Sequence, residues 1–176
     1  MKEERLYIVG YMASGKTTFG RALARRLGWD FIDLDEQIEL EQGRSIPELM
    51  RSVGEPAFRA MESAALKKTS ARRKVIVACG GGTPCFGGNM EFMTLHGHTL
   101  WLVASPEKMA ERIELQAGSR PLAAGKSGPE LLAFVKSHLL ARQQYYCQAE
   151  WRLNSDSLET AEEIERTIDN FLDNRK

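Results

Sequence analysis

Residues 6–17 are Leu6-Tyr7-Ile8-Val9-Gly10-Tyr11-Met12-Ala13-Ser14-Gly15-Lys16-Thr17. The first four are apolar and predict a buried parallel strand. Apolar residues at helical spacing from Lys16 to Leu27 predict a helix, and Gly28 stands where such a helix ends. The residues between strand and helix satisfy G-x-x-x-x-G-K-[ST], the phosphate-binding loop (P-loop), in the context that this motif requires. The stretch therefore predicts an α/β protein that binds a nucleoside triphosphate.

Each residue type in this loop has a chemical reason to be there. The glycines allow backbone N–H groups to point inward, and the start of the helix adds positive potential for phosphate oxygens. Lys16 supplies a charge for the β- and γ-phosphates, and the Thr17 hydroxyl can bind Mg²⁺. For Ser14 and Thr18 two roles stay open, contact with phosphate or capping of the helix. The residues predicted to bind the nucleotide are Gly10, Ala13, Ser14, Gly15, Lys16, Thr17 and Thr18.

Short apolar runs alternate with helical patterns along the rest of the chain. This alternation predicts a single domain over residues 1–176, a three-layer α/β sandwich with a five-stranded, mostly parallel sheet. Glycine and proline residues interrupt the segment 117–128, so it cannot be one continuous helix or strand. A loop of this length inside a compact domain favours a functional lid. The further strands are predicted at 31–34, 75–78, 99–103 and 151–153, and helices at 35–42, from Ser45, from Pro56, after Ser105, from Pro129 to about Cys147, and from Thr160.

Composition excludes several classes of protein. Lys+Arg and Asp+Glu are 24 each, so no overall charge favours a nucleic acid or an anionic membrane as partner. The apolar runs are too short for a membrane helix, and the charged start of the chain does not resemble a secretory signal, so we expect a cytoplasmic protein. We also expect a monomer. Cys79, Cys85 and Cys147 are an odd number at no metal-ligand spacing, which favours reduced thiols.

Candidate residues for the phosphate acceptor follow the second and third predicted strands. Ligands of open α/β sheets lie at the carboxyl ends of the strands, so Asp33 and Asp35 are expected near the P-loop. One carboxylate can hold Mg²⁺ or its waters and the other can accept a proton, although either could instead cap the next helix. Arg59 alone is more typical of an exposed surface charge than of a binding residue. The run Gly80-Gly81-Gly82 invites close approach of a ligand, or is only a tight turn.

A chain of 176 residues leaves no room for a separate effector domain, so a small-molecule kinase is the expected class. The chain resembles the shikimate kinase family along nearly its whole length. The resemblance is carried, in family order, by the P-loop, Asp33-Leu34-Asp35, Gly43-Arg44-Ser45-Ile46, Phe58-Arg59 with Glu62, Gly80-Gly81-Gly82, Arg120-Pro121-Leu122, and Arg142 with Tyr146.

This resemblance implies a P-loop kinase fold with sheet order 2-3-1-4-5 and transfer of the γ-phosphoryl of ATP to the 3-hydroxyl of shikimate, a step of aromatic amino-acid biosynthesis. Mg²⁺ is the implied cofactor, and shikimate and ATP are the implied substrates. The shikimate-binding segment corresponds to about residues 33–62, and the lid to about 117–128.

The resemblance also implies a role for each matching residue. Asp35 would hold the shikimate hydroxyls and take the attacking proton, and Asp33 would be the outer partner of Mg²⁺. The shikimate carboxylate would lie between Arg59 and Arg142, because planar guanidinium groups give paired charge-assisted hydrogen bonds. Glu62 would orient Arg59. The remaining implied site residues are Gly80, Gly81 and Gly82, with backbone N–H groups against the substrate, and Arg120, with Lys16, on the phosphates.

One spacing departs from the family pattern. Many members have an arginine seven positions before the lid arginine, stacked on adenine, whereas Arg112 lies eight positions before Arg120. Adenine contacts are otherwise expected near Asn154 to Ser157. Two alternative functions remain, a related kinase for gluconate or a nucleotide, and an ATP-binding module without catalysis. His96, His98 and His138 share no ligand spacing and are interpreted as surface or packing residues.

Overall fold

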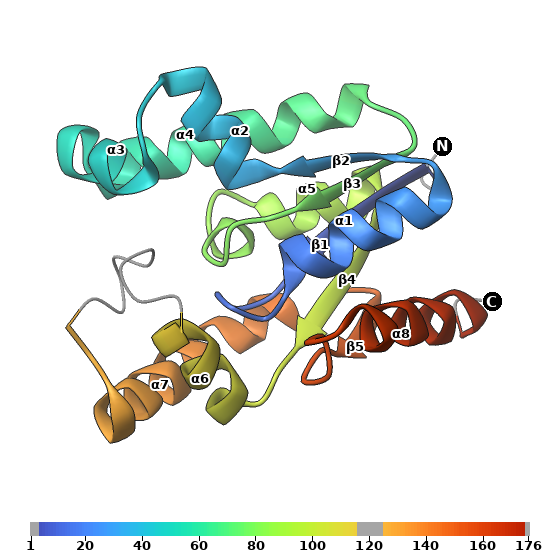
Figure 1. The fold of residues 1–176 in the computed structure, drawn as a ribbon. Helices are drawn as coiled ribbons and strands as arrows, with labels where there is room; N and C mark the ends of the chain where they lie inside the picture. The colour runs from blue at the N-terminus through green and yellow to red at the C-terminus, as the bar shows by residue number, and fades with distance from the viewer. Residues whose placement is uncertain (1–3, 116–124, 175–176) are drawn as a thin grey trace.

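The structure is a computed structural model that describes residues 4–115 and 125–174 (Figure 1). Its centre is one parallel sheet of five strands in the order β2-β3-β1-β4-β5. This order and the parallel pairing confirm the predicted fold. The strands are β1 (Arg5–Val9), β2 (Asp30–Asp33), β3 (Val75–Ala78), β4 (His98–Val103) and β5 (Trp151–Asn154).

Helices cover both faces of the sheet (Figure 1). Two of them, α1 and α8, share a buried apolar cluster with one face, and the cluster on the other face takes side chains from all the remaining helices. The helices are α1 (Lys16–Leu27), α2 (Leu34–Gln42), α3 (Ile46–Val53), α4 (Glu55–Lys68), α5 (Asn89–His96), α6 (Pro106–Leu115), α7 (Gly128–Tyr146) and α8 (Ala161–Asp173).

The predicted capping signals act as expected. Glu48 accepts from the backbone N–H of Ser45 at the start of α3, and Glu163 does the same for Thr160 at the start of α8. Both helices therefore begin at the residues that the capping boxes indicate. None of the helices within residues 4–115 and 125–174 is long and apolar enough to cross a membrane.

Several sequence predictions were wrong in detail, among them the start of α4, which is Glu55 rather than Pro56. Helix α5 was not predicted, because Gly87-Gly88 before it favours a loop and its burial rests on a few side chains such as Met90 and Met93. The second strand was expected to include Leu34, but this residue begins α2. Helix α7 begins one residue earlier than expected, at Gly128, whose N–H donates to the Glu114 carboxylate at 2.6 Å.

Candidate active site

The P-loop joins β1 to α1 and has the shape that its glycines permit. Gly10 has a φ of +146°, and a β-carbon there would stand 2.6 Å from the carbonyl oxygen of Leu102 on β4. Only glycine fits this position without displacing the neighbouring strand. Gly15, with a φ of 90°, is the residue before the first turn of α1. The loop therefore presents the start of α1 at the carboxyl edge of the sheet.

Lys16 lies under the loop rather than in solvent. Its ammonium group is buried and donates to the carbonyl oxygens of Gly10, at 2.9 Å, and Tyr11, at 2.8 Å. These contacts hold a positive charge beside the backbone that would surround phosphate. The role of Lys16 on the β- and γ-phosphates stays a prediction.

The two hydroxyls with open roles behave differently. Ser14 is fully buried, and its Oγ has no hydrogen-bond partner among the described residues. Thr18 is exposed. Since Gly15 occupies the capping position of α1 and no side chain caps it there, the capping interpretation of Ser14 was wrong. The Ser14 hydroxyl is instead a buried polar group without a hydrogen-bond partner among the described residues, and buried polar groups normally have one.

The two aspartates after β2 have separate tasks. Asp33 accepts the Thr17 hydroxyl at 2.6 Å, and its other oxygen accepts the backbone N–H groups of Asp35 and Glu36 at the start of α2. Asp33 is thus the capping residue of α2, and the suggestion that Asp35 caps this helix was wrong. The capping bonds fix Asp33 next to Thr17, and they leave the side chain of Asp35 available on the first turn of α2.

Asp35 belongs to a cavity of about 260 Å³ between the sheet edge and helices α2, α3, α4 and α7. This volume suits a metabolite rather than a drug-sized ligand. The cavity brings together the residues predicted to bind shikimate and places a P-loop residue, Met12, in the same wall. It is lined by Met12, Asp35, Glu39, Ile46, Pro47, Met50, Phe58, Arg59, Glu62, Gly80, Gly81, Gly82 and Arg142.

Arg59 is fixed in this cavity from several sides. Its guanidinium donates to Glu62 at 2.5 Å and to Glu55 at 3.0 Å, and it lies 4.5 Å from the ring centre of Phe86. Only 12% of the side chain is exposed, so the interpretation as a free surface charge was wrong. Glu62 is buried and also accepts from the Thr83 hydroxyl at 2.7 Å. The predicted orienting contact of Glu62 is therefore present.

The three glycines after β3 make room for the charged side chains. A β-carbon on Gly80 would stand 2.7 Å from Oδ1 of Asp35, and one on Gly82 would stand 2.6 Å from Nη1 of Arg59. At Gly81 the nearest atoms would be the Met12 nitrogen at 3.3 Å and an Arg142 nitrogen at 3.5 Å. The run is thus more than a tight turn. Its missing side chains let the carboxylate and both guanidinium groups reach the same cavity.

Arg142 enters the cavity from α7. It is buried, with 9% exposure, which is unusual for an arginine. Four residues further along α7, the Tyr146 hydroxyl donates to the carbonyl oxygen of Gly81 at 2.5 Å. This bond attaches α7 to the glycine turn. It therefore keeps Arg142 beside Gly81.

The pKa of Asp35 is raised to about 6, mainly because burial disfavours its charged form. The negative charges of Glu62 and Asp33 raise the pKa further, and Lys16 acts in the opposite direction. A carboxylate with such a pKa accepts a proton more readily than an exposed aspartate and is still ionised at neutral pH. The site therefore contains a group suited to remove a proton from a substrate.

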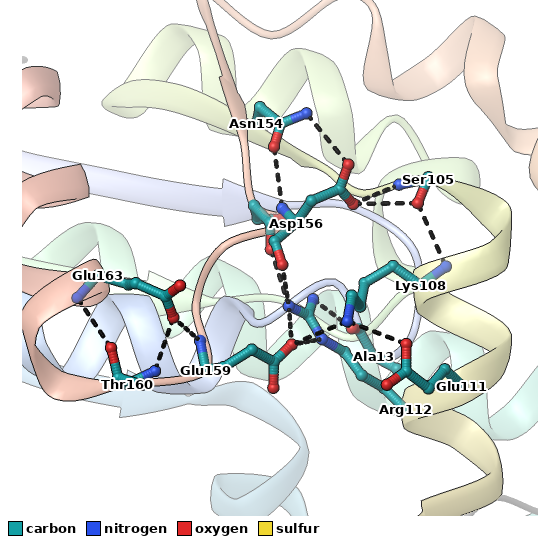
Figure 2. Close-up of polar contacts among 11 residues, drawn as sticks. Ala13, Ser105, Lys108, Glu111, Arg112, Asn154, Asp156, Glu159, Thr160 and Glu163 are labelled. Carbon is teal, nitrogen blue, oxygen red and sulfur yellow. Dashed lines mark hydrogen bonds and ion pairs between the residues drawn. The ribbon is translucent and has the colours of Figure 1, made fainter.

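Arg112 on α6 connects the P-loop with the loop between β5 and α8 (Figure 2). Its guanidinium donates to the carbonyl oxygens of Ala13 at 3.3 Å, Ser155 at 3.0 Å and Asp156 at 3.1 Å, and it pairs with Glu159. The predicted adenine region thus lies directly beside the P-loop. All of these bonds use N–H groups at the edge of the Arg112 guanidinium.

Figure 2 also shows how Asp156 ties that loop to α6. Its carboxylate accepts from the backbone N–H of Ser105 at 2.7 Å, and the Ser105 hydroxyl caps α6 by accepting from the Lys108 N–H. Asn154 accepts from the Asp156 N–H at 2.9 Å. These bonds give the β5–α8 loop a defined shape where the family resemblance places the adenine.

Some of the predicted site lies outside the described residues, namely Arg120 and most of the predicted lid. Other site residues were missed. Glu39 and Met50 line the cavity, but isolated side chains on a helical pattern carry no signal of a pocket. Tyr11 was quoted only as a variable position of the P-loop, and His138 was assigned to the surface or packing. The structure joins these two by a hydrogen bond of 3.0 Å.

Taken together, a P-loop at the carboxyl edge of a 2-3-1-4-5 sheet and an acceptor cavity beside it define a P-loop kinase. Comparison with known proteins narrows this class. The model of the shikimate kinase family matches residues 12–173, so the chain belongs to the shikimate kinase family.

Individual relatives agree with this family. The chain is 38% identical to a shikimate kinase of Parabacteroides distasonis over 92% of this chain and 93% of the relative. A crystal structure of shikimate kinase from Bacteroides thetaiotaomicron superposes with a TM-score of 0.94 at 37% identity, covering 98% of each chain. The shikimate kinase of Acinetobacter baumannii, solved in complex with shikimate, has a TM-score of 0.82 at 28% identity over 98% of this chain and 95% of that one.

Proposed function

We propose that this protein is a shikimate kinase, which transfers the γ-phosphoryl group of ATP to the 3-hydroxyl of shikimate and releases ADP. One observation carries the proposal: Asp35, Arg59 and Arg142 line a single cavity whose wall includes Met12 of the P-loop. A base for the substrate hydroxyl, two arginines for a carboxylate and the loop for a triphosphate are therefore adjacent. The family membership supports the same acceptor.

On the nucleotide side, the backbone N–H groups of the P-loop and the Lys16 ammonium would bind the β- and γ-phosphates of ATP. The loop residues assigned to the nucleotide are Gly10, Ala13, Ser14, Gly15, Lys16, Thr17 and Thr18. Ser14 is supported by its buried hydroxyl, which has no partner among the described residues and which a phosphate oxygen would satisfy. Arg120 is proposed to contact the phosphates from the lid at about 117–128.

The residues next to the P-loop also fit Mg²⁺. Thr17 and Asp33 place a hydroxyl and a carboxylate oxygen 2.6 Å apart, and hard oxygen ligands are those that Mg²⁺ prefers. No cluster of three acidic, histidine or cysteine side chains within residues 4–115 and 125–174 forms a cage for a metal. This is typical of an ion that takes most ligands from phosphate and water. When bound, Mg²⁺ would supply positive charge to the phosphate oxygens.

The acid would lie with its carboxylate between Arg59 and Arg142, because both side chains line the cavity and their guanidinium groups can form paired bonds with a carboxylate. Arg59 keeps its position through Glu62. Backbone N–H groups of Gly80, Gly81 and Gly82 would contact the ring hydroxyls. Residues 33–62, which carry Asp35 and Arg59, form the proposed shikimate-binding segment of one single-domain protein.

Asp35 would act as the base. Its carboxylate takes the proton as the O–H bond of the 3-hydroxyl breaks. The oxygen forms a bond to the γ-phosphorus while the bond from that phosphorus to the bridging oxygen of ADP breaks. Lys16 and the arginines compensate the charge that gathers on the phosphoryl oxygens. The raised pKa of Asp35 supports this role, because it brings the base closer to the working pH.

The proposal includes a monomer in the cytoplasm that binds neither nucleic acid nor membrane. The balanced charge of the chain, 24 basic and 24 acidic residues, supports the absence of polyanionic partners. Three cysteines without disulfide bonds support a reducing compartment.

A steady-state assay with ATP, Mg²⁺ and shikimate tests the proposal. We expect formation of ADP that depends on shikimate and is matched by shikimate 3-phosphate. A parallel panel with gluconate and nucleoside monophosphates should give no comparable turnover. Turnover on gluconate but not on shikimate would instead support the related small-molecule kinase, and ATP binding without any acid binding would support the non-catalytic module.

A further inference from the structure

One face of α7 contacts both loops of the site. His138, Arg142 and Tyr146 follow one another at intervals of four residues, so they lie along one side of the helix. Tyr146 bonds to the glycine turn, and His138 bonds to the P-loop residue Tyr11, with Arg142 between them. The helix that carries the proposed carboxylate-binding arginine is therefore attached to the nucleotide loop on one side and to the substrate turn on the other.

Tyr11 is the residue of the P-loop that makes this attachment. Only 1% of it is exposed, and its hydroxyl shares a hydrogen bond of 3.0 Å with Nδ1 of His138. The two rings meet edge to face, with centres 5.6 Å apart and planes at 88°. The carbonyl oxygen of Tyr11 accepts from Lys16. One residue thus has its backbone in the proposed phosphate site and its side chain against α7.

The aromatic face of Tyr11 supports Arg142. The guanidinium carbon lies 5.9 Å from the centre of the Tyr11 ring, within the range of a cation–π contact. The hydrogen bond to His138 and the edge contact add to the packing around this buried ring in fixing its orientation. His138 itself packs against Phe134 on the preceding turn of α7, with ring centres 5.1 Å apart.

We propose that Tyr11, held in place by His138, is a positioning residue that fixes the Arg142 guanidinium in the substrate cavity. The inference deepens the proposed function and rests on it, because it assigns the pair to the binding of the acid. Tyr11 acts through Arg142. The pair spans 127 positions of the chain, which explains why no local pattern indicated it.

A neutral imidazole suits this position. The pKa of His138 is lowered, first because the ring is partly removed from water and second because the positive charge of Arg142 disfavours another cation nearby. A neutral ring can share a hydrogen bond with Tyr11 without repelling Arg142. The electrostatics of the pair therefore agree with the geometry.

The test is a kinetic comparison of Tyr11→Phe with wild type. The substitution keeps the ring and removes the hydroxyl, so the ring is no longer fixed by His138. We expect the KM for shikimate to rise about 3- to 10-fold, the usual effect of one buried hydrogen bond, while kcat and the KM for ATP change less than about 2-fold. An unchanged shikimate KM, or an equal rise in both KM values, would overturn the proposal.

Variants of His138 provide the second arm. His138→Leu should raise the shikimate KM as Tyr11→Phe does, and the double variant should be no worse than either single one, because both remove the same bond. His138→Asn, whose side-chain oxygen can replace Nδ1 as hydrogen-bond partner, should restore part of the affinity. Strictly additive effects in the double variant would contradict a shared role.

Tyr145→Phe is the matched control. It removes a hydroxyl from the same helix, and Tyr145 is partly buried with no side-chain hydrogen bond among the described residues. All its kinetic constants should equal those of wild type. A general loss of structure in Tyr11→Phe would lower kcat and the melting temperature without raising the shikimate KM alone, and that pattern counts against the proposal.

Failure of the proposed function gives a different result. In that case wild type itself would show no turnover with shikimate, whereas a wrong inference leaves wild type active and Tyr11→Phe indistinguishable from it. The two hypotheses are thus separated by the first measurement of the series.

Discussion

Gly80 and Asp35 are so close that a β-carbon on the glycine would stand 2.7 Å from Oδ1 of the aspartate. The same β-carbon would lie 3.0 Å from both Glu62 and Thr83, so the carboxylate has no simple way to move aside. The glycine is therefore part of what places the proposed base. The close contact also brings the turn after β3, where Gly80 stands, next to the first turn of α2, where Asp35 stands.

Gly80→Ala should consequently impair catalysis. We expect kcat to fall about 100-fold, the scale of a misplacement of about 1 Å at a reacting group. Gly81→Ala is the comparison, because its β-carbon would meet the Met12 nitrogen at 3.3 Å and Arg142 at 3.5 Å, which small shifts can accommodate. Steady-state kinetics of both variants checks this. Equal losses in the two variants would show that the Asp35 contact is not the reason.

Asp35→Asn should lower kcat about 10²- to 10⁴-fold, because the variant has no carboxylate to accept the proton. In wild type, kcat/KM should fall as the pH drops through about 6, where Asp35 becomes protonated. Asp30→Asn, at the exposed start of β2, is the control and should keep wild-type turnover. An Asp35→Asn variant with near wild-type kcat would remove Asp35 from the role of base.

The same substitution should stabilise the protein at neutral and basic pH. The pKa of Asp35 rises from 3.8 to about 6 on folding, so the folded protein binds this proton more tightly than the unfolded chain. The stability that this residue contributes is therefore highest below about pH 4 and is lost as the pH rises through 6. Asparagine carries no charge at any pH.

Thermal unfolding of wild type and Asp35→Asn over a range of pH values checks this. The melting temperature of the variant should exceed that of wild type at pH 8, and the difference should shrink between pH 6 and pH 4. A difference that does not depend on pH would mean that burial does not raise the pKa of Asp35. The test needs no substrate, so it stands apart from the assignment of the reaction.

Arg142→Lys should weaken shikimate binding far more than ATP binding. A lysine keeps the charge but cannot give two parallel bonds to a carboxylate, and it lacks the flat guanidinium that lies over Tyr11. We expect the KM for shikimate to rise about 10- to 100-fold, since a hydrogen bond to a charged group contributes about 1.5–3 kcal/mol. Arg166→Lys on the exposed face of α8 serves as control. Similar effects on both substrates would contradict the carboxylate assignment.

Thr17→Val should raise the Mg²⁺ concentration needed for half-maximal activity. The variant removes the hydroxyl that donates to Asp33 at 2.6 Å and that is proposed to bind the ion. Thr17→Ser keeps the hydroxyl and should need about as much Mg²⁺ as wild type. Titration of activity with Mg²⁺ at saturating ATP checks both variants. A Val variant with an unchanged Mg²⁺ requirement would exclude Thr17 as a ligand.

Local signals predicted the elements well where they were strong. The P-loop lies in one continuous segment, and α1 begins at Lys16 and ends at Leu27 as its apolar spacing and Gly28 indicate. Weak local signals failed. Helix α5 was missed because its neighbouring glycines outweigh its few buried residues, and the end of β2 was misplaced because the capping of α2 by Asp33 competes with the strand.

The residues proposed to bind the phosphate acceptor were also predicted, but each as a separate candidate. Arg59 alone is indistinguishable from an exposed charge, and its burial beside Phe86 and Glu62 follows from packing between α4 and the glycine turn. The bond between Tyr11 and His138 is a further case. Nothing in the sequence around Tyr11 or His138 predicts that the two are in contact. Their contact requires the sheet to place the P-loop beside α7.

By itself, then, the sequence determined the nucleotide loop, the alternation of strands and helices, and the kinds of side chain available for an acid and a proton, because these depend on neighbours within a few residues. Only the tertiary structure decided that Asp35, Arg59 and Arg142 share one cavity and that Tyr11 meets His138. The physical reason is that a charged side chain acquires its burial, its pKa and its partners from segments far away in the chain, which come together only when the sheet forms.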